Sequence, residues 1–239
     1  DLLDDPELSP DVPLCRAQEA GGDSMIDEYT LLHVLRHHRY MPDFLAAEAS
    51  REWINPGVVP AEERRVGFMG LGFIGLSAAR RVRDIGFQTA AWSRTKKDEP
   101  GIESFFGMDQ IDDFLARTDI LVNLLAITPE TVNILNSRNF ALLPKGGCVI
   151  NLGRGEAIVD QDLIAALDSG HLHSATLDVF RIEPLPADHP FWTHPRITVM
   201  PHTSRRPRAS QIIPHAVENI RRFRAGEPLL QPVIRERGY

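Results

Sequence analysis

Six short runs of apolar residues recur through the middle of the chain, and each is nearly continuous rather than alternating with polar positions. Continuous runs of this length are typical of strands that are buried on both faces of a sheet. The predicted strands span residues 66–69, 89–92, 120–125, 149–152, 175–179 and 197–200.

Segments with helical spacing separate these runs. They span residues 73–85, 109–117, 136–142 and 160–169, with Asp109 and Asp160 as the expected N-caps and Gly170 as the expected C-cap. Strands that alternate with helices in this way predict an α/β fold, a doubly wound parallel sheet with right-handed crossovers.

Helical patterns also lie outside the strand region. An early one covers 25–53, where Pro42 either kinks the helix or opens a second one. A late one covers 208–224, is rich in Arg, and is expected to stop at Gly226. Residues 1–22 contain three prolines and a Gly-Gly pair, which predicts loop and edge segments.

Composition narrows the class of protein. The chain has 26 basic and 33 acidic residues, a net charge of −7 and 43% hydrophobic residues, which is typical of a soluble globular protein. No apolar stretch approaches the roughly 18 residues of a membrane span. The start of the chain is acidic, unlike a secretory signal, and its two cysteines cannot form a disulfide framework. We expect a cytoplasmic protein with no membrane or nucleic-acid partner.

One glycine-rich turn carries the strongest local signal. Gly70, Gly72 and Gly75 form a G-x-G-x-x-G pattern directly between a predicted strand and a predicted helix, with Phe73 and Ile74 inside it. In this pattern the first glycine permits a tight turn, the second lets the backbone approach a pyrophosphate, and the third allows close packing of helix and strand. The context predicts a dinucleotide-binding site.

The residues after the second predicted strand indicate which dinucleotide. An NAD site would place Asp or Glu there, whereas this chain has Ser93, Arg94, Thr95 and Lys96. A guanidinium binds a 2′-phosphate through charge-assisted hydrogen bonds, and neighbouring hydroxyls can assist. The sequence therefore predicts NADP as the cofactor.

Three further residues follow later strands, where an open α/β sheet has its ligand crevice. Reduction of a 2-keto acid needs a cation to bind the carboxylate, an acid to protonate the carbonyl oxygen, and a group that orients this acid. Arg154, His202 and Glu183 supply these three groups in turn. A carboxylate beside an imidazole favours the protonated ring, as a proton donor requires.

The early helix contains three histidines, His33, His37 and His38. His33 and His37 are four residues apart, but no third ligand is evident nearby, so we expect no metal site. We expect this helix face to pack on a partner instead.

These motifs together resemble the D-isomer-specific 2-hydroxyacid dehydrogenases. The resemblance rests on residues 70–75, 92–94, 124–131, 151–159, 175–186 and 198–202. The C-terminal residues 226–239 are similar to the glyoxylate/hydroxypyruvate reductase A branch, which prefers NADPH.

The resemblance implies a role for each site residue. Arg154 would bind and polarise the keto acid, Glu183 would assist His202, and His202 would donate the proton. Asp178 would contact the nicotinamide carboxamide, while Leu125 and Thr128 would line the cofactor groove. The remaining residues that the resemblance places at the cofactor are Ala126, Leu152, Gly153, Arg154, His202 and Ser204.

The resemblance also predicts the organisation of the chain. The glycine-rich loop begins much earlier than in full-length members, so residues 1–22 would be the remnant of a substrate domain. Residues 23–205 would form the NADP-binding domain with its dimerisation helix, and 206–239 would return to the substrate domain. After His202, the loop is shorter than in relatives.

Two functions stay open at this point. The first is NADPH-dependent reduction of glyoxylate or hydroxypyruvate to the D-2-hydroxy acid by a homodimer. The alternative is a non-catalytic, NADP-binding dimeric module that senses redox state. The set Arg154, Glu183 and His202 favours the enzyme, because a sensor would not require it.

Overall fold

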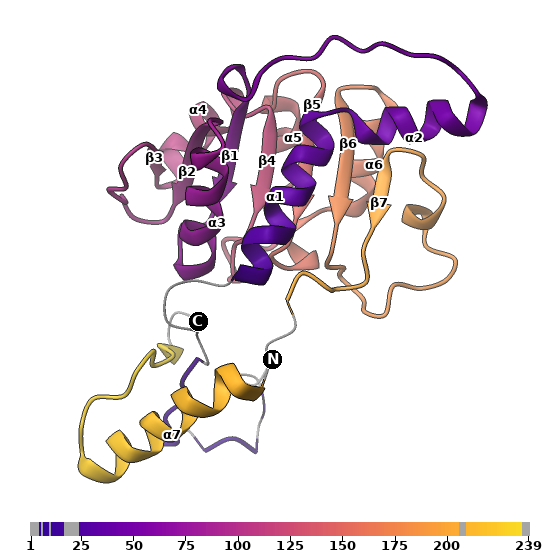
Figure 1. The fold of residues 1–239 in the computed structure, drawn as a ribbon. Coiled ribbons are helices and arrows are strands. Elements are labelled where there is room, and N and C mark those ends of the chain that lie inside the picture. The colour runs from indigo at the N-terminus through magenta and orange to yellow at the C-terminus, as the bar shows by residue number, and fades with distance from the viewer. Residues whose placement is uncertain (1–4, 6, 10, 17–23, 206–208, 236–239) are drawn as a thin grey trace. The chain divides into compact units, whose positions relative to one another are not determined.

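A seven-stranded parallel sheet lies at the centre of the computed structural model, in the order β3-β2-β1-β4-β5-β6-β7 (Figure 1). The structure describes residues 5, 7–9, 11–16, 24–205 and 209–235. The strands are β1 (Arg65–Met69), β2 (Gln88–Ser93), β3 (Glu103–Phe106), β4 (Ile120–Asn123), β5 (Gly147–Asn151), β6 (Leu172–Leu177) and β7 (Ile197–Val199). From β1 the chain winds first to β3 and then returns to the other side at β4, which confirms the predicted doubly wound fold.

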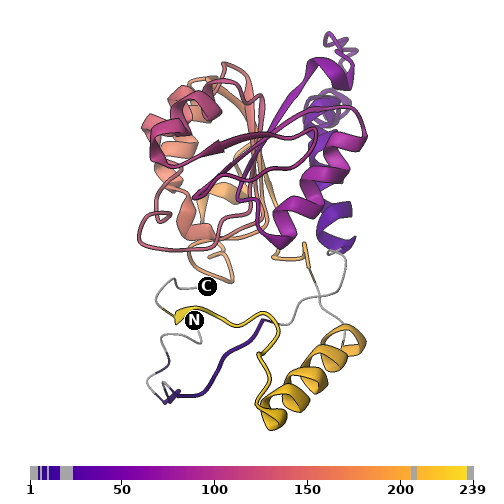
Figure 2. The ribbon, with the colours of Figure 1, turned by 90° about the vertical axis from the view of Figure 1, so that its left-hand side faces the viewer.

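Helices cover both faces of the sheet (Figure 2). The helices are α1 (Ser24–His38), α2 (Met41–Ser50), α3 (Phe73–Asp84), α4 (Ile111–Ala116), α5 (Ser137–Leu142), α6 (Asp160–Asp168) and α7 (Ala209–Ala225). Apolar residues of α1 and α3 pack with Phe68 and Val122 in one core. Apolar residues of α4, α5 and α6 pack with Leu121 and Val149 in the other. Neighbouring strand residues thus face opposite cores, as the pleat requires.

The six predicted strands are all present, with ends that differ by up to three residues. The prediction missed β3, a half-buried four-residue strand at the edge of the sheet. The two N-cap predictions are wrong: Asp109 lies in a 3₁₀ turn before α4, and Asp160 is the first helical residue of α6. Acidic side chains in a first turn favour the helix through its dipole without capping it.

The early helical pattern is two helices. Tyr40 has φ 54° between α1 and α2, and Pro42 lies in the first turn of α2. A proline is well tolerated there, because an amide at the start of a helix has no intrahelical partner. Pro42 therefore opens a second helix, the second of the two alternatives.

The chain divides into two compact units, one of residues 24–204 and one of 1–23 with 205–239. In the smaller unit, the amide of Arg16 donates to Gln231 O (2.9 Å) and that of Val233 donates to Leu14 O (2.9 Å). This short antiparallel pairing ties its two segments together. No helix in the described ranges is long and apolar enough to cross a membrane.

Helix α7 belongs to the smaller unit and is amphipathic. Its exposed apolar side chains, each more than half accessible to solvent, are Ile213, Val217, Ile220 and Phe223. Its polar side is paired: Arg221 contacts both Glu218 (2.9 Å) and Glu227 (2.8 Å), and Arg222 contacts Glu218 (2.7 Å). Residue 208, the first of the predicted helix, lies outside the described residues.

Candidate active site

The predicted site residues all lie at or just beyond the carboxyl ends of the parallel strands, where loops project from one edge of the sheet. Strand β1 leads to Gly70–Gly75, β2 to Ser93–Lys96 and β4 to Leu125, Ala126 and Thr128. Strand β5 leads to Leu152–Arg154, β6 to Asp178 and Glu183, and β7 to His202 and Ser204.

The turn between β1 and α3 has the geometry of an anion cradle. Gly70 has φ +99°, a conformation that favours glycine, and a Cβ on Gly75 would overlap the carbonyl oxygen of Gly70. The first hydrogen bond of α3 runs from Leu76 N to Gly72 O (2.8 Å). The amides of Phe73, Ile74 and Gly75 therefore precede the hydrogen-bond ladder, and the space beside Gly72 is open. Such a turn can hold a pyrophosphate.

The turn after β2 is basic. Ser93 is buried and its hydroxyl donates to Thr95 O (2.8 Å), which closes the turn, while Arg94, Thr95 and Lys96 are exposed. No carboxylate occurs among residues 93–97 that would repel a phosphate. On the loop after β4, the Thr128 hydroxyl is the main cause that lowers the pKa of Glu130, and the Arg94 charge acts in the same direction.

A buried pair of amides, Asn123 and Asn151, connects the next two loops. Asn123 Nδ2 donates to Asn151 Oδ1 (2.9 Å), and the amide of Leu125 donates to Asn123 Oδ1 (3.2 Å). Asn151 Oδ1 also accepts from Gly153 N (3.2 Å), and its Nδ2 donates to Arg154 O (3.0 Å). The pair sets the path of both loops. Sequence reasoning missed this role, although both residues end apolar strands, where a buried polar side chain is unusual.

Arg154 presents its guanidinium to solvent from the loop after β5. Its side chain donates to Gly153 O (2.8 Å), and no carboxylate in the described part of the chain pairs with it. The next residue, Gly155, lies so close to Phe180 that a Cβ would overlap the Phe180 backbone. This contact fixes the Arg154 loop beside the loop that follows β6.

The side chains of Glu183 and His202 lie within hydrogen-bonding distance of each other. His202 Nδ1 lies 2.7 Å from Glu183 Oε2, with the two side chains 48% and 34% exposed. Glu183 Oε1 accepts from the amide of Phe180 (2.9 Å), so this carboxylate is itself held. His202 has φ 50°, and its amide donates to Met200 O (3.0 Å). A left-handed conformation at a non-glycine residue is uncommon, and strained backbone of this kind recurs at active sites.

Asp178 is fully buried and organises the turn after His202. Its Oδ1 accepts from the amide of Thr203 (2.8 Å) and from the hydroxyl of Tyr29 (2.9 Å), and its Oδ2 accepts from the amide of Ser204 (2.9 Å). The sequence analysis named Asp178 and Ser204 but missed Tyr29. Nothing local to Tyr29 in the sequence marks it, because its partners lie about 150 residues away.

The histidines of α1 have a different role from the one expected. His33, His37 and His38 are all buried within this chain, where α1 packs on the sheet, rather than displayed to a partner. No group of three metal-ligating side chains occurs among the described residues.

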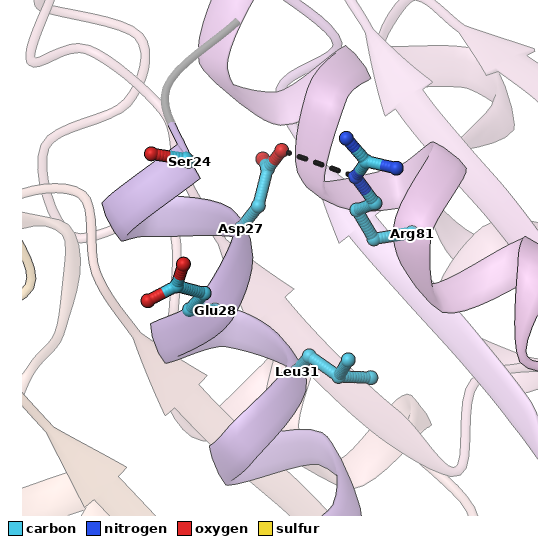
Figure 3. Close-up of a pocket in the computed structure, with 5 residues that line it drawn as sticks. All are labelled: Ser24, Asp27, Glu28, Leu31 and Arg81. Carbon is cyan, nitrogen blue, oxygen red and sulfur yellow. Dashed lines mark ion pairs between the residues drawn. The ribbon is translucent and has the colours of Figure 1, made fainter.

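A pocket of about 240 Å³ lies between α1 and α3 (Figure 3). It is lined by Ser24, Asp27, Glu28, Leu31 and Arg81. The Asp27 carboxylate already accepts from Ser77 Oγ (2.7 Å) and lies 3.5 Å from Arg81 Nε. This carboxylate therefore stabilises the contact between the two helices, and the strand-end edge remains the candidate active site.

Comparison with known proteins agrees with this geometry. Residues 30–204 match the NAD-binding domain of the D-isomer specific 2-hydroxyacid dehydrogenases. The chain is 39% identical to glyoxylate/hydroxypyruvate reductase A of Klebsiella pneumoniae strain 342, over 100% of this chain and 77% of that protein.

Two solved structures are also close. A D-isomer specific 2-hydroxyacid dehydrogenase from Xanthobacter autotrophicus Py2, in complex with NADPH and MES, has a TM-score of 0.96 and 41% identity, covering 100% of this chain and 98% of that one. An NADPH-dependent glyoxylate/hydroxypyruvate reductase from Sinorhizobium meliloti, in complex with NADP and sulfate, has a TM-score of 0.94 and 37% identity, covering 100% and 76%.

The family match spans most of the chain, and the relatives share both its fold and more than a third of its residues. This protein belongs to the D-isomer-specific 2-hydroxyacid dehydrogenases, in the glyoxylate/hydroxypyruvate reductase A branch.

Proposed function

We propose that this protein reduces a small 2-keto acid, glyoxylate or hydroxypyruvate, to the D-2-hydroxy acid with NADPH. The observation that carries the proposal is the 2.7 Å pair of His202 and Glu183 on the same sheet edge as the glycine-rich cradle. Proton donor and cofactor site would then serve one reaction. The NADPH and NADP complexes of two relatives, and the name of the Klebsiella relative, support the same cofactor and substrates.

The residues present fit NADP. The amides of Phe73, Ile74 and Gly75 would bind the pyrophosphate, and Ser93, Arg94, Thr95 and Lys96 would bind the 2′-phosphate. Leu125, Ala126, Thr128, Leu152 and Gly153 would line the groove, and Asp178 and Ser204 would border its nicotinamide end. When bound, the cofactor supplies a hydride to the carbonyl carbon of the substrate.

Arg154 would bind the substrate. Its guanidinium is exposed and has no carboxylate partner among the described residues, and only Nη1 donates to Gly153 O, so the edge formed by Nε and Nη2 can bind a carboxylate. Charge on this side chain would also polarise the keto group and stabilise the negative oxygen that develops as the hydride arrives.

His202 would supply the proton. Glu183 holds Nδ1, which leaves Nε2 as the ring nitrogen that donates to the carbonyl oxygen. Because the Phe180 amide anchors Glu183, the ring has a defined orientation before substrate binds.

The direct test is the loss of NADPH absorbance with glyoxylate or hydroxypyruvate, run on the full-length protein beside the same assay with NADH. We expect turnover with NADPH and much slower turnover with NADH. The control is His202→Asn, which should bind NADPH but turn over slowly. Binding of NADPH without reduction of either keto acid would favour the non-catalytic, redox-sensing module instead.

We further propose a homodimer formed through α2 and the segment that follows it. Apolar side chains are unusually exposed there, Trp53 completely and Val58, Leu45, Met41 and Phe44 by 38–57%. An exposed cluster of this kind indicates a surface that another protein covers.

Sedimentation velocity tests the dimer. We expect twice the chain mass for the wild type and a shift to the single-chain mass for Phe44→Glu. Met108→Glu, at an exposed apolar residue of the 3₁₀ turn before α4, is the control and should leave the mass unchanged. A single-chain mass for the wild type over a wide concentration range would contradict the proposal.

A further inference from the structure

A row of polar side chains, all buried except the half-buried Tyr29, lies between α1 and β6. We call it the α1–β6 seam, and it consists of Tyr29, His33 and His37 on α1 and of Ser174, Thr176 and Asp178 on and just after β6. The helix residues are four apart and the strand residues two apart, so each set lies on one face of its element. The seam ends at Asp178, beside the catalytic turn.

His37 fixes the register of the seam. Its Nδ1 lies 2.9 Å from Ser174 Oγ and its Nε2 lies 2.9 Å from Thr176 Oγ1. Burial lowers the pKa of His37 to about 3, with the nearby His33, Arg36 and His173 acting in the same direction, so the ring stays neutral. Two hydrogen bonds from one rigid ring leave α1 little freedom to slide along β6.

Tyr29 occupies the end of the seam nearest the active site. Its hydroxyl donates to Asp178 Oδ1 (2.9 Å) and lies 3.4 Å from Thr203 Oγ1. The ring of His33 packs edge-on against it, with centroids 4.6 Å apart. Burial, more than any neighbour, raises the pKa of Tyr29, so the hydroxyl keeps its proton and acts as a donor.

Asp178 connects the Tyr29 hydroxyl to the backbone that follows His202. The amides of Thr203 and Ser204, the two residues that follow His202, both donate to the Asp178 carboxylate. The carboxylate is fully buried, so each donor it loses is not replaced by water. A displaced Asp178 would therefore release the backbone immediately after the catalytic histidine.

We propose that Tyr29 is a positioning residue for the reaction, acting through its hydrogen bond to Asp178 to hold the 202–204 turn so that His202 stays against Glu183. This inference rests on the proposed function of His202 as proton donor. Tyr29 makes no hydrogen bond with Glu183 or His202, so its effect is transmitted by Asp178 with the two amides and by the contact with the Thr203 hydroxyl.

The test compares Tyr29→Phe with Tyr40→Phe. The control, Tyr40→Phe, also removes the hydroxyl of a half-buried tyrosine. Tyr40 Oη accepts a hydrogen bond from Arg64 Nη2 (3.2 Å), and both residues precede β1 in the chain. Two readouts are taken on the full-length protein. The first is amide hydrogen exchange of the peptide that contains Thr203 and Ser204, measured without cofactor. The second is the single-turnover rate of NADPH oxidation at saturating glyoxylate, with the affinity for NADPH and the melting temperature measured beside it.

Tyr29→Phe should exchange faster at Thr203 and Ser204 and should slow the single-turnover rate about tenfold, the effect of losing one hydrogen bond to a charged group. Tyr40→Phe should change neither, and both variants should melt at similar temperatures. Unchanged exchange in Tyr29→Phe, or faster exchange with a rate like that of Tyr40→Phe, would overturn the inference. Absence of NADPH oxidation in the wild type would instead overturn the proposed function, while the exchange measurement would still report on the turn.

Discussion

Two constraints act on the imidazole of His202, one from its side-chain partner and one from its own backbone. Glu183 holds Nδ1 at 2.7 Å, and the left-handed φ of 50° turns the chain sharply at this residue. In the proposed reaction, orientation of this kind would lower the barrier to proton transfer, because the donor would not have to be organised during the reaction.

Replacement of His202 by Asn should therefore affect chemistry more than binding. We expect kcat to fall by about 100-fold or more, since proton donation is lost in the transition state, with NADPH affinity nearly unchanged. Steady-state kinetics with glyoxylate and fluorescence titration with NADPH measure the two effects. A variant that keeps nearly normal kcat would remove His202 from the role of proton donor.

Replacement of Arg154 by Lys tests the planar cation. An ammonium keeps the charge but cannot bind a carboxylate through two parallel hydrogen bonds. We expect kcat/KM for the keto acid to fall by roughly 100-fold with little change in NADPH affinity. Arg196→Lys, at an exposed arginine just before β7, serves as the matched control. Wild-type kinetics in Arg154→Lys would show that bidentate binding is not needed.

At the scale of elements, the pattern of apolar runs predicted six of the seven strands, and the helices between them, in their correct order along the chain. Strands that are buried on both faces are nearly continuous in Val, Ile, Leu and Ala, and their signal depends on no distant residue. Strand β3 was missed because it is short, lies at the edge and is only half-buried. The residues that position the site were missed for a different reason: Tyr29, Asn123 and Asn151 act through contacts between elements that no local pattern records.

Helix α1 should make the stability of the protein depend on pH. In the folded state the pKa of His37 is lowered to about 3 and that of His33 to about 4, in each case mainly by burial. Unfolding returns both rings to water, so the unfolded chain binds more protons between pH 6.5 and these values. The free energy of unfolding should therefore fall as the pH drops below about 6.5.

The variant His37→Gln isolates one of the two rings. Glutamine does not titrate, so we expect the variant to be less stable at pH 7 but to lose about 2 kcal/mol less than the wild type between pH 7 and pH 5. Urea denaturation at several pH values measures this slope. His215→Gln on α7 is the control and should follow the wild-type slope. Parallel curves for His37→Gln and the wild type would contradict the assignment of this pH dependence to His37.

At the scale of the whole molecule, the two units differ in how completely they cover their apolar residues. Residues 24–204 enclose two cores, whereas α7 of the smaller unit leaves Ile213, Val217, Ile220 and Phe223 exposed. The chain spans 77% of the length of its Klebsiella relative. A continuous apolar stripe of this size is rarely left open to water in a stable monomer.

This stripe should bind a hydrophobic dye when these 239 residues are prepared alone. We expect Val217→Glu to lower anilinonaphthalene sulfonate fluorescence by about half, because a charge in the centre of the stripe interrupts it. Met108→Glu, at a residue of nearly equal exposure, should leave the signal as it is. NADPH affinity should be the same in both variants. Equal fluorescence in both would place the dye-binding surface elsewhere.

Asp178 lies beside both ends of the 24–204 unit. Tyr29 donates to it close to the first end, and the amide of Ser204 donates to it at the last residue. The Asp178 carboxylate thus joins the first and last segments of this unit through hydrogen bonds. A chimaera that exchanges the residues before Ser24 and after Ser204 for those of another protein should keep these hydrogen bonds, because all the residues that form them lie within the unit. The 202–204 turn, and with it the position of His202, should then be retained in the chimaera.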